Sequence, residues 1–308
     1  SSSDYSSLGE LLGRLIGYCN ERHINISLPS LRVDAFSIDI MSKVQDVKKS
    51  SLTFAPEAGT QHMRDVINKN LTLESILSGC REAFLGGWNK VKLYFMLGQP
   101  FETTEDIEGI ASLANEIAAV YYDTVPKEKR NGRVQITASS SFFVPKPFTA
   151  FQWATQNTDD EFREKAHTVK SAVLSQLNRK SIRYVWHDPD TSRLEGVFAR
   201  GDRRLSAVIL KAYEKGCMYD AWSESFHYDR WMEAFSECGV DPDFYTTRTR
   251  REDEIFPWDF IDCGVKKEFL LKEWRKAKEA VTTPNCKENC SGCGSAKFGC
   301  GICVGKRK

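Results

Sequence analysis

SLTFAPEAGT (Ser51–Thr60) and KVKLYFMLGQPFET (Lys90–Thr103) open and close the stretch that decides the fold. Each is a short apolar run that stops at proline, glycine and a carboxylate, which is typical of a buried strand. Between them, helices are predicted at Gln61–Ile67 and Leu73–Leu85, with Thr72 as N-cap and Gly86-Gly87 as the stop. Strand, helix and strand in this order predict a βαβ unit with parallel strands and a right-handed crossover.

The run from Leu93 to Leu97 is apolar at every position, so we expect this strand to be covered on both faces. In parallel sheets, ligands bind beyond the carboxyl ends of the strands. Glu57, Gly98, Gln99 and Glu102 fall at those ends. They are the first candidates for a functional site.

Further elements extend outward from this unit. The periodicity predicts helices and strands, in chain order, at 8–21 (helix), 24–28 (strand), 104–122 (helix), 134–144 (strand), 160–178 (helix) and 182–186 (strand). The alternation then fades into helical patterns at 205–215 and 267–281, and the spacing of Trp222, Phe226, Trp231 and Phe235 suggests an aromatic helix between them. We expect an α/β domain over residues 1–190, a helical and loop-rich extension over 191–281, and a cysteine-rich tail over 282–308. About five strands permit an open sheet or part of a TIM-like (β/α) barrel.

The bulk properties exclude some classes of protein. The chain has 308 residues, 41% hydrophobic and 28% charged, which is ordinary for a globular protein. Its net charge of +1 gives no general attraction to nucleic acids or acidic membranes. The arginine clusters at 200–204 and 248–251 are interleaved with acids, which predicts a salt-bridged surface. With no signal peptide and no long apolar run, we expect a cytoplasmic protein with no membrane partner.

Ten cysteines are unusual for a cytosolic chain, where dense clusters indicate metal or redox chemistry more often than disulfides. Five are scattered and predicted to be buried, small hydrophobic residues: Cys19, Cys80, Cys217, Cys238 and Cys263. Five lie in the tail and are predicted to bind a metal: Cys286, Cys290, Cys293, Cys300 and Cys303. Thiolates ligate iron–sulfur clusters and zinc alike, and the spacing leaves both open. None of the five histidines has a cysteine or histidine at ligand spacing, so each is predicted to be structural or exposed.

Several segments resemble a known family. FAPEAGTQHMRDVINKN (Phe54–Asn70) and YFMLGQPFETTED (Tyr94–Asp106) resemble the fourth and fifth barrel strands of radical S-adenosylmethionine (SAM) enzymes. Other segments are similar to an uncharacterised bacterial family that fuses a cobalamin-binding-like domain to a radical SAM domain: LPSLRVDAF (28–36), FVPKPFTAFQWA (143–154), RGDRRL (200–205) and TTPNCKENCSGCG (282–294). The family's CxxxCxxC cluster loop does not precede Glu57, so the resemblance implies the C-terminal part of a longer enzyme.

The resemblance also implies roles for individual residues. Glu57 would bind the SAM ribose, although it could equally favour the N-terminus of the next helix. The backbone at Gly98-Gln99 would approach the adenine, which Met96 and Val144 would flank. Ser30 and Arg32 would contact the SAM carboxylate or ribose, unless they belong to a surface loop.

These roles imply an enzyme that cleaves SAM reductively for radical chemistry on an unknown substrate. The catalytic [4Fe–4S] cluster would be held by the missing N-terminal portion, so this chain alone would be inactive. Cobalamin in the full-length protein and an electron donor such as flavodoxin or ferredoxin would be its partners. The cysteine tail would hold an auxiliary iron–sulfur cluster or zinc. A competing hypothesis is a stand-alone metal-binding module that contacts RNA; a flavodoxin-like nucleotide binder would lack its usual glycine-rich loop.

Overall fold

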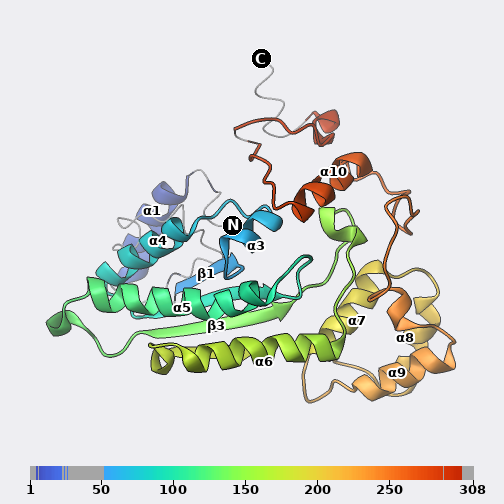
Figure 1. Cartoon of the computed structure of the whole chain (residues 1–308), viewed down its shortest axis with the longest axis horizontal. Coiled ribbons are helices and arrows are strands. Elements are labelled where there is room, and N and C mark those ends of the chain that lie inside the picture. The colour runs from blue at the N-terminus through green and yellow to red at the C-terminus, as the bar shows by residue number, and fades with distance from the viewer. Residues whose placement is uncertain are drawn as a thin grey trace. The chain divides into compact units, whose positions relative to one another are not determined.

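The computed structural model describes residue 5 and residues 7–22, 24, 26, 52–286 and 288–299 (Figure 1). Ser30, Arg32, Cys300 and Cys303 lie outside the described residues, as does most of the strand predicted at 24–28. The chain divides into two compact units. The sheet unit takes in residues 1–97, 102–141 and 165–187, and the helical unit takes in 98–101, 142–164 and 188–308.

A four-stranded parallel sheet forms the centre of the sheet unit. Its strands are β1 (Leu52–Glu57), β2 (Lys90–Leu97), β3 (Gln135–Phe142) and β4 (Ile182–Trp186), in the spatial order β1-β2-β3-β4. Leu52 pairs with Val91 in a parallel register, and Ile136 pairs in the same way with Ile182. The predicted α/β class and the parallel βαβ unit are therefore confirmed.

One face of β1 and β2 is buried, and the other face is only partly covered. Buried and less buried side chains alternate along both strands, and in β2 Leu93 and Phe95 are buried while Tyr94 between them is 39% exposed. The prediction that β2 is covered on both faces was wrong. Successive side chains of a strand point to opposite faces, and only one of the two series packs into the core. Tyr94 and Met96 lie on the other face of the strand, which an apolar run does not reveal.

α3 (Gln61–Val66) and α4 (Leu73–Leu85) connect β1 to β2, and α5 (Thr104–Thr124) connects β2 to β3. α6 (Asp159–Ser175), whose residues up to 164 belong to the helical unit, comes between β3 and β4 in the chain, and α1 (Leu8–Asn20) precedes β1. The Thr72 hydroxyl accepts a hydrogen bond from Ser75 N at the start of α4, and Gly87 with φ 88° follows its end, as predicted. α4 and α5 lie side by side (Figure 1), where Phe84 and Tyr121 meet edge to face at 5.2 Å.

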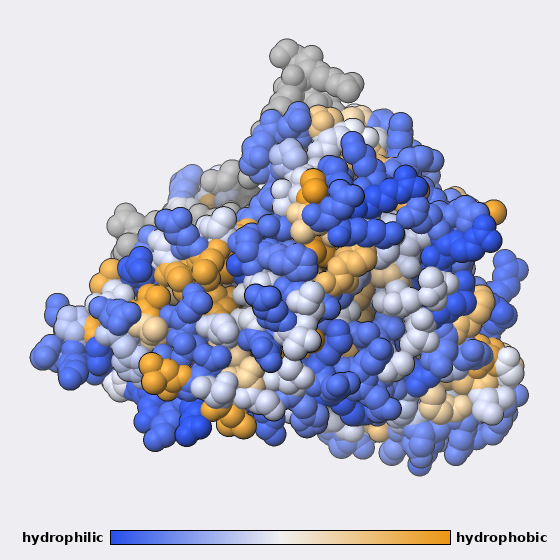
Figure 2. Space-filling view, in the orientation of Figure 1, coloured by the Kyte–Doolittle hydropathy of each residue, from blue (hydrophilic) through white to orange (hydrophobic). Residues whose placement is uncertain are grey.

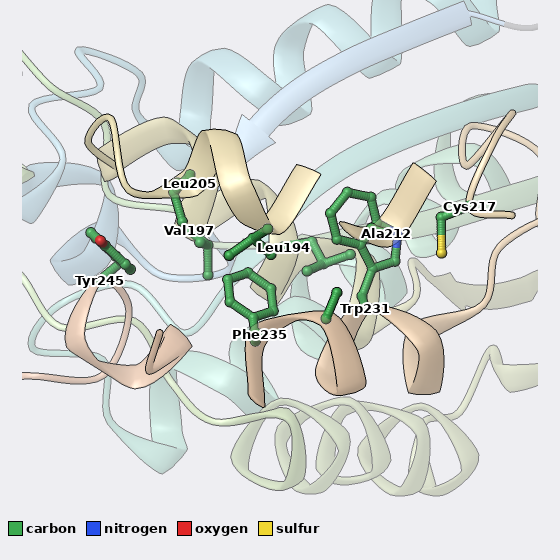
Figure 3. Close-up of a cluster of buried hydrophobic side chains, with 10 residues drawn as sticks. Leu194, Val197, Leu205, Ala212, Cys217, Trp231, Phe235 and Tyr245 are labelled. Carbon is green, nitrogen blue, oxygen red and sulfur yellow. The ribbon is translucent and has the colours of Figure 1, made fainter. Parts of the chain in front are cut away.

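The helical unit has its own apolar core (Figure 3). Its helices are α7 (Pro189–Arg200), α8 (Leu205–Glu214), α9 (Tyr228–Glu237) and α10 (Lys267–Lys278). Short 3-10 turns in the described chain lie at Lys127–Lys129, Ala150–Trp153, Arg179–Ser181, Pro242–Phe244 and Ser295–Phe298. Val197, Val208 and Phe235 bring α7, α8 and α9 together in the core. α7 was not predicted, although Asp188 caps it and Pro189 stands at its first turn.

The arginine clusters are only partly at the surface. Arg204 and Arg251 make the expected pairs with Asp202 and Asp253. Arg200 and Arg250, in contrast, are 1% and 7% exposed and donate to backbone carbonyls, so the predicted salt-bridged surface was wrong for these two. Burial lowers the pKa of Arg200 to about 9.

In the described part of the chain, no helix combines the length and the apolar character that crossing a bilayer requires. Hydrophilic residues cover most of the face seen in Figure 2, with apolar residues scattered among them.

Candidate functional site

Glu57 ends β1 in an unusual backbone conformation. Its φ is 67°, a left-handed value that costs a non-glycine residue about 1–2 kcal/mol. The pairing with β2 shifts register between Phe54 and Glu57, so that an extra residue is accommodated on β1. Such bulges re-aim side chains and are frequent beside active sites. Glu57 thus combines a strained backbone with a carboxylate at the carboxyl end of a parallel strand.

Glu57 forms an ion pair with a lysine of the same unit. Lys69 Nζ lies 3.1 Å from Glu57 Oε1, with the two side chains 37% and 28% exposed. Thr60 caps α3 by accepting from Met63 N at 3.2 Å, and the alternative role of Glu57, to favour the N-terminus of this helix, stays a prediction. The ion pair holds the carboxylate in place while leaving it partly open to solvent.

A hydrogen-bond network that the sequence did not predict begins at Thr60, in the loop that follows Glu57. We call Thr60, His62, Thr103 and Asp106 the strand-end network; it joins the loop after β1 to the start of α5. Thr60 Oγ1 and Thr103 Oγ1 both donate to Asp106, the latter at 2.8 Å, and Thr103 N donates at 2.9 Å. His62 Nδ1 lies 2.9 Å from Asp106 Oδ2. The carboxylate at the centre is 3% exposed.

The electrostatics of Asp106 follow from these contacts. Burial disfavours its charge, but the hydrogen bonds from Thr60, Thr103 and His62 outweigh burial and hold its pKa below the ordinary value. His62 is 46% exposed, and its Nδ1 contact to Asp106 fixes the ring orientation. The pair resembles a positioned acid–base group. The Thr103-x2-Asp106 capping box was the signal in the sequence that could have found the network.

The other predicted SAM residues lie in different places. Met96 is on the less buried face of β2, in the sheet unit. Gly98, Gln99 and Val144 belong to the helical unit, where Gln99 and Val144 are 4% and 8% exposed. A Cβ on Gly98, whose φ is 78°, would lie 2.4 Å from Phe162 Cε1, so packing against this chain's own ring is enough to require glycine there.

Glu102, a further strand-end residue, is already paired. Its side chain is 4% exposed, and Lys165 Nζ donates to Oε2 at 2.7 Å. Nearby on β4, burial, assisted by the charge of Glu102, raises the pKa of Tyr184. Tyr184 also stacks at a tilt on Trp186, with ring centroids 5.4 Å apart. This group stabilises the fold rather than opening to a ligand.

The described cysteines of the tail are accessible. Cys286 and Cys290 are exposed and Cys293 is half-buried. Hydrogen bonding to Ser295, whose hydroxyl lies 3.4 Å from Cys293 Sγ, lowers the pKa of that thiol. Within residues 52–286, 288–299 and the described parts of 5–26, no three cysteine, histidine or acidic side chains are grouped to hold a metal. The described thiols of the tail are thus accessible, but they are not grouped into a binding site.

No family model matches the chain. The chain is 32% identical over 209 residues to the uncharacterized protein MJ0966 of Methanocaldococcus jannaschii. The alignment covers 68% of this chain and 41% of that protein, so the chain spans less than half the length of its relative. The matched region occurs there as part of a longer protein.

Proposed function

We propose that the chain is part of a radical SAM enzyme, in which its sheet is a segment of a TIM-like (β/α) barrel. The strand order is the observation that supports this most. Crossovers between parallel strands are right-handed. When the strands lie in the sheet in the same order as in the chain, the connecting segments therefore all cross on the same face of the sheet. A doubly wound fold would reverse its order at the ligand site. The alternating burial of β1 and β2 agrees with a barrel segment in which the less buried face of the sheet would line the barrel interior.

Glu57 is the proposed ligand of the SAM ribose. A carboxylate can accept both hydroxyl hydrogens of a ribose diol, and its place at the end of β1 is where barrel enzymes bind substrates. Its left-handed backbone supports a role beyond packing, since such strain persists mainly at functional sites. Lys69, which now pairs with Glu57, would orient it or exchange for the diol.

The remaining SAM contacts are weaker proposals. Met96, on the less buried face of β2, would reach the adenine from the barrel interior. Gly98, Gln99 and Val144 stay predictions, as do Ser30 and Arg32, which the structure does not describe. His62, held by Asp106, would accept or donate a proton beside the ribose.

The rest of the enzyme would come from other components. A cluster loop upstream of Ser1 would hold the catalytic [4Fe–4S] centre, and cobalamin would belong to the same upstream portion. When bound, SAM would supply the radical chemistry, and flavodoxin or ferredoxin would serve as the electron donor of the enzyme. The cysteine tail would bind an auxiliary iron–sulfur cluster or zinc, and the protein would act in the cytoplasm.

SAM chemistry tests the proposal. The protein extended upstream of Ser1 would be reconstituted with iron and sulfide without oxygen, reduced, and analysed for 5′-deoxyadenosine and methionine. We expect both products in equal amounts from the extended protein and neither from the present chain alone. An extended protein that binds no SAM in equilibrium dialysis and forms neither product would overturn the assignment. Zinc without iron or sulfide in the purified protein would favour a metal-binding interaction module instead.

A further inference from the structure

Two turns of the helical unit that are distant in sequence lie against each other. The first, residues 262–266, precedes α10, and the second, residues 293–298, follows Cys290 in the tail. Lys266 N donates to Cys293 O at 2.9 Å. Lys297 Nζ forms an ion pair with the Asp262 carboxylate at the other end of the same contact. The tail therefore returns to the segment that carries Cys263.

Two glycines make this contact close. A Cβ on Gly294 would lie 2.8 Å from Gly264 O, and a Cβ on Gly264 would lie 2.2 Å from the Phe298 ring. Both glycines have left-handed backbones, with φ 106° and 88°. Side chains larger than hydrogen would separate the turns. Each glycine directly follows a cysteine, so Cys263 and Cys293 flank the point where the two backbones touch.

Cys263 does not behave as a structural cysteine. It was predicted to be buried like the other scattered cysteines, but it is exposed, whereas Cys19, Cys80 and Cys217 are buried. Its Sγ lies 3.9 Å from Val265 O, over the same turn that meets the tail. An exposed thiol at this position adds nothing to the apolar core. It remains available to a ligand shared with the tail.

We propose that Cys263 is a thiolate ligand of the metal site in the tail, together with Cys286, Cys290 and Cys293. This inference rests on the metal-binding part of the proposed function and adds a ligand that sequence spacing does not indicate. Three tail thiolates and Cys263 complete the four ligands that a tetrahedral zinc ion or a [4Fe–4S] cluster takes. A Zn²⁺ ion would displace one proton from each of the four thiols and form four Zn–S bonds.

Folding of the tail onto the metal would assemble the site. The described thiols are not grouped in this structure, and metal sites of this kind commonly form only as the ligands close around the ion. The contact between the two turns already brings together the backbones at Gly264 and Gly294, the residues that follow Cys263 and Cys293.

Alkylation of individual cysteines tests the inference. The metal-free chain would be treated with iodoacetamide before and after addition of Zn²⁺, and in a separate arm after reconstitution with iron and sulfide without oxygen. Peptide mass spectrometry would give the rate at each cysteine. We expect metal to slow alkylation of Cys263 at least tenfold, together with Cys290 and Cys293, in one of the two arms. Half-buried Cys238, outside both turns, is the control and should not change.

The other outcomes are distinct. Protection of Cys290 and Cys293 without Cys263 would overturn the inference while leaving a metal site in the tail. Protection of none of them in either arm would overturn both. In support, Cys263→Ser should weaken Zn²⁺ binding at least tenfold against Cys238→Ser, with the circular dichroism of both variants unchanged. Equal Zn²⁺ affinity of the two variants would count against Cys263 as a ligand.

Discussion

The strand-end network and the cysteine tail are opposite kinds of site. In the network, a buried carboxylate is surrounded by hydrogen-bond donors without any ligand present. In the tail, Cys286 and Cys290 are exposed and no group of thiols is formed among the described residues. The first is organised by folding, whereas the second would, on our proposal, be organised by a metal ion or cluster. A rigid rim suits an organic molecule that must be oriented, whereas thiols on turns suit a metal that imposes its own geometry.

The largest expected effect is on the network. Asp106→Ala should lower the free energy of unfolding by about 2–3 kcal/mol, because it leaves the donors of Thr60 and Thr103 without their acceptor and removes the capping box of α5. Urea denaturation of the parent chain and the variant gives this difference in the free energy of unfolding. Asp123→Ala, at an exposed position of the same helix, is the control and should change the free energy by less than about 0.5 kcal/mol. Equal effects of the two variants would mean that the network does not stabilise the fold.

Glu57 comes next. Glu57→Gln should weaken SAM binding at least tenfold, about 1.4 kcal/mol, because the amide cannot accept two hydroxyl hydrogens as a carboxylate does. Equilibrium dialysis with the upstream-extended protein gives the affinity. Glu74→Gln, exposed in the first turn of α4, is the matched control. If both variants bind SAM as the parent does, the ribose role of Glu57 is wrong although the fold assignment stands.

The pH dependence of stability sharpens the comparison further. The fold holds the pKa of Asp106 below its value in the unfolded chain, about 3.9. Its ionised form therefore stabilises the fold at pH values above the unfolded pKa, and that contribution is lost as the pH falls through the folded pKa. The stability difference between the parent and Asp106→Asn should be constant from pH 7 to about 5 and shrink below it. A difference that stays constant down to about pH 2 would contradict the lowered pKa.

The smallest effect is expected in the tail. Without metal, replacing Cys290 and Cys293 together by serine should change the free energy of unfolding by less than about 0.5 kcal/mol, because both lie at or near the surface. The same double variant should lose most of the metal bound per chain, measured by elemental analysis. A large loss of stability in the metal-free variant would mean that folding alone organises the tail, as it does the network.

The sequence predicted the elements of the sheet well. The strands at 52–57, 90–97 and 182–186 and the caps at Thr72 and Gly86 all follow from local rules that the structure confirms. The strand predicted at 134–144 ends at Phe142, before the prolines that follow it. α7 was missed although Leu194, Val197 and Phe198 stand at helical spacing after the cap at Asp188. The placement of Ser30, Arg32, Cys300 and Cys303 lies outside the described residues.

By itself, the sequence determined the parallel βαβ unit, the strand-end position of Glu57 and the spacing of the tail cysteines, because periodicity, caps and turns act between neighbours along the chain. The tertiary structure alone decided that His62 meets Asp106 across 44 residues of chain, that Lys266 N meets Cys293 O, and that Arg200 is buried. These partners meet only because whole helices and strands pack against one another. The spacing of residues in the sequence does not reveal such contacts, since the same residue types would be equally suitable at the surface.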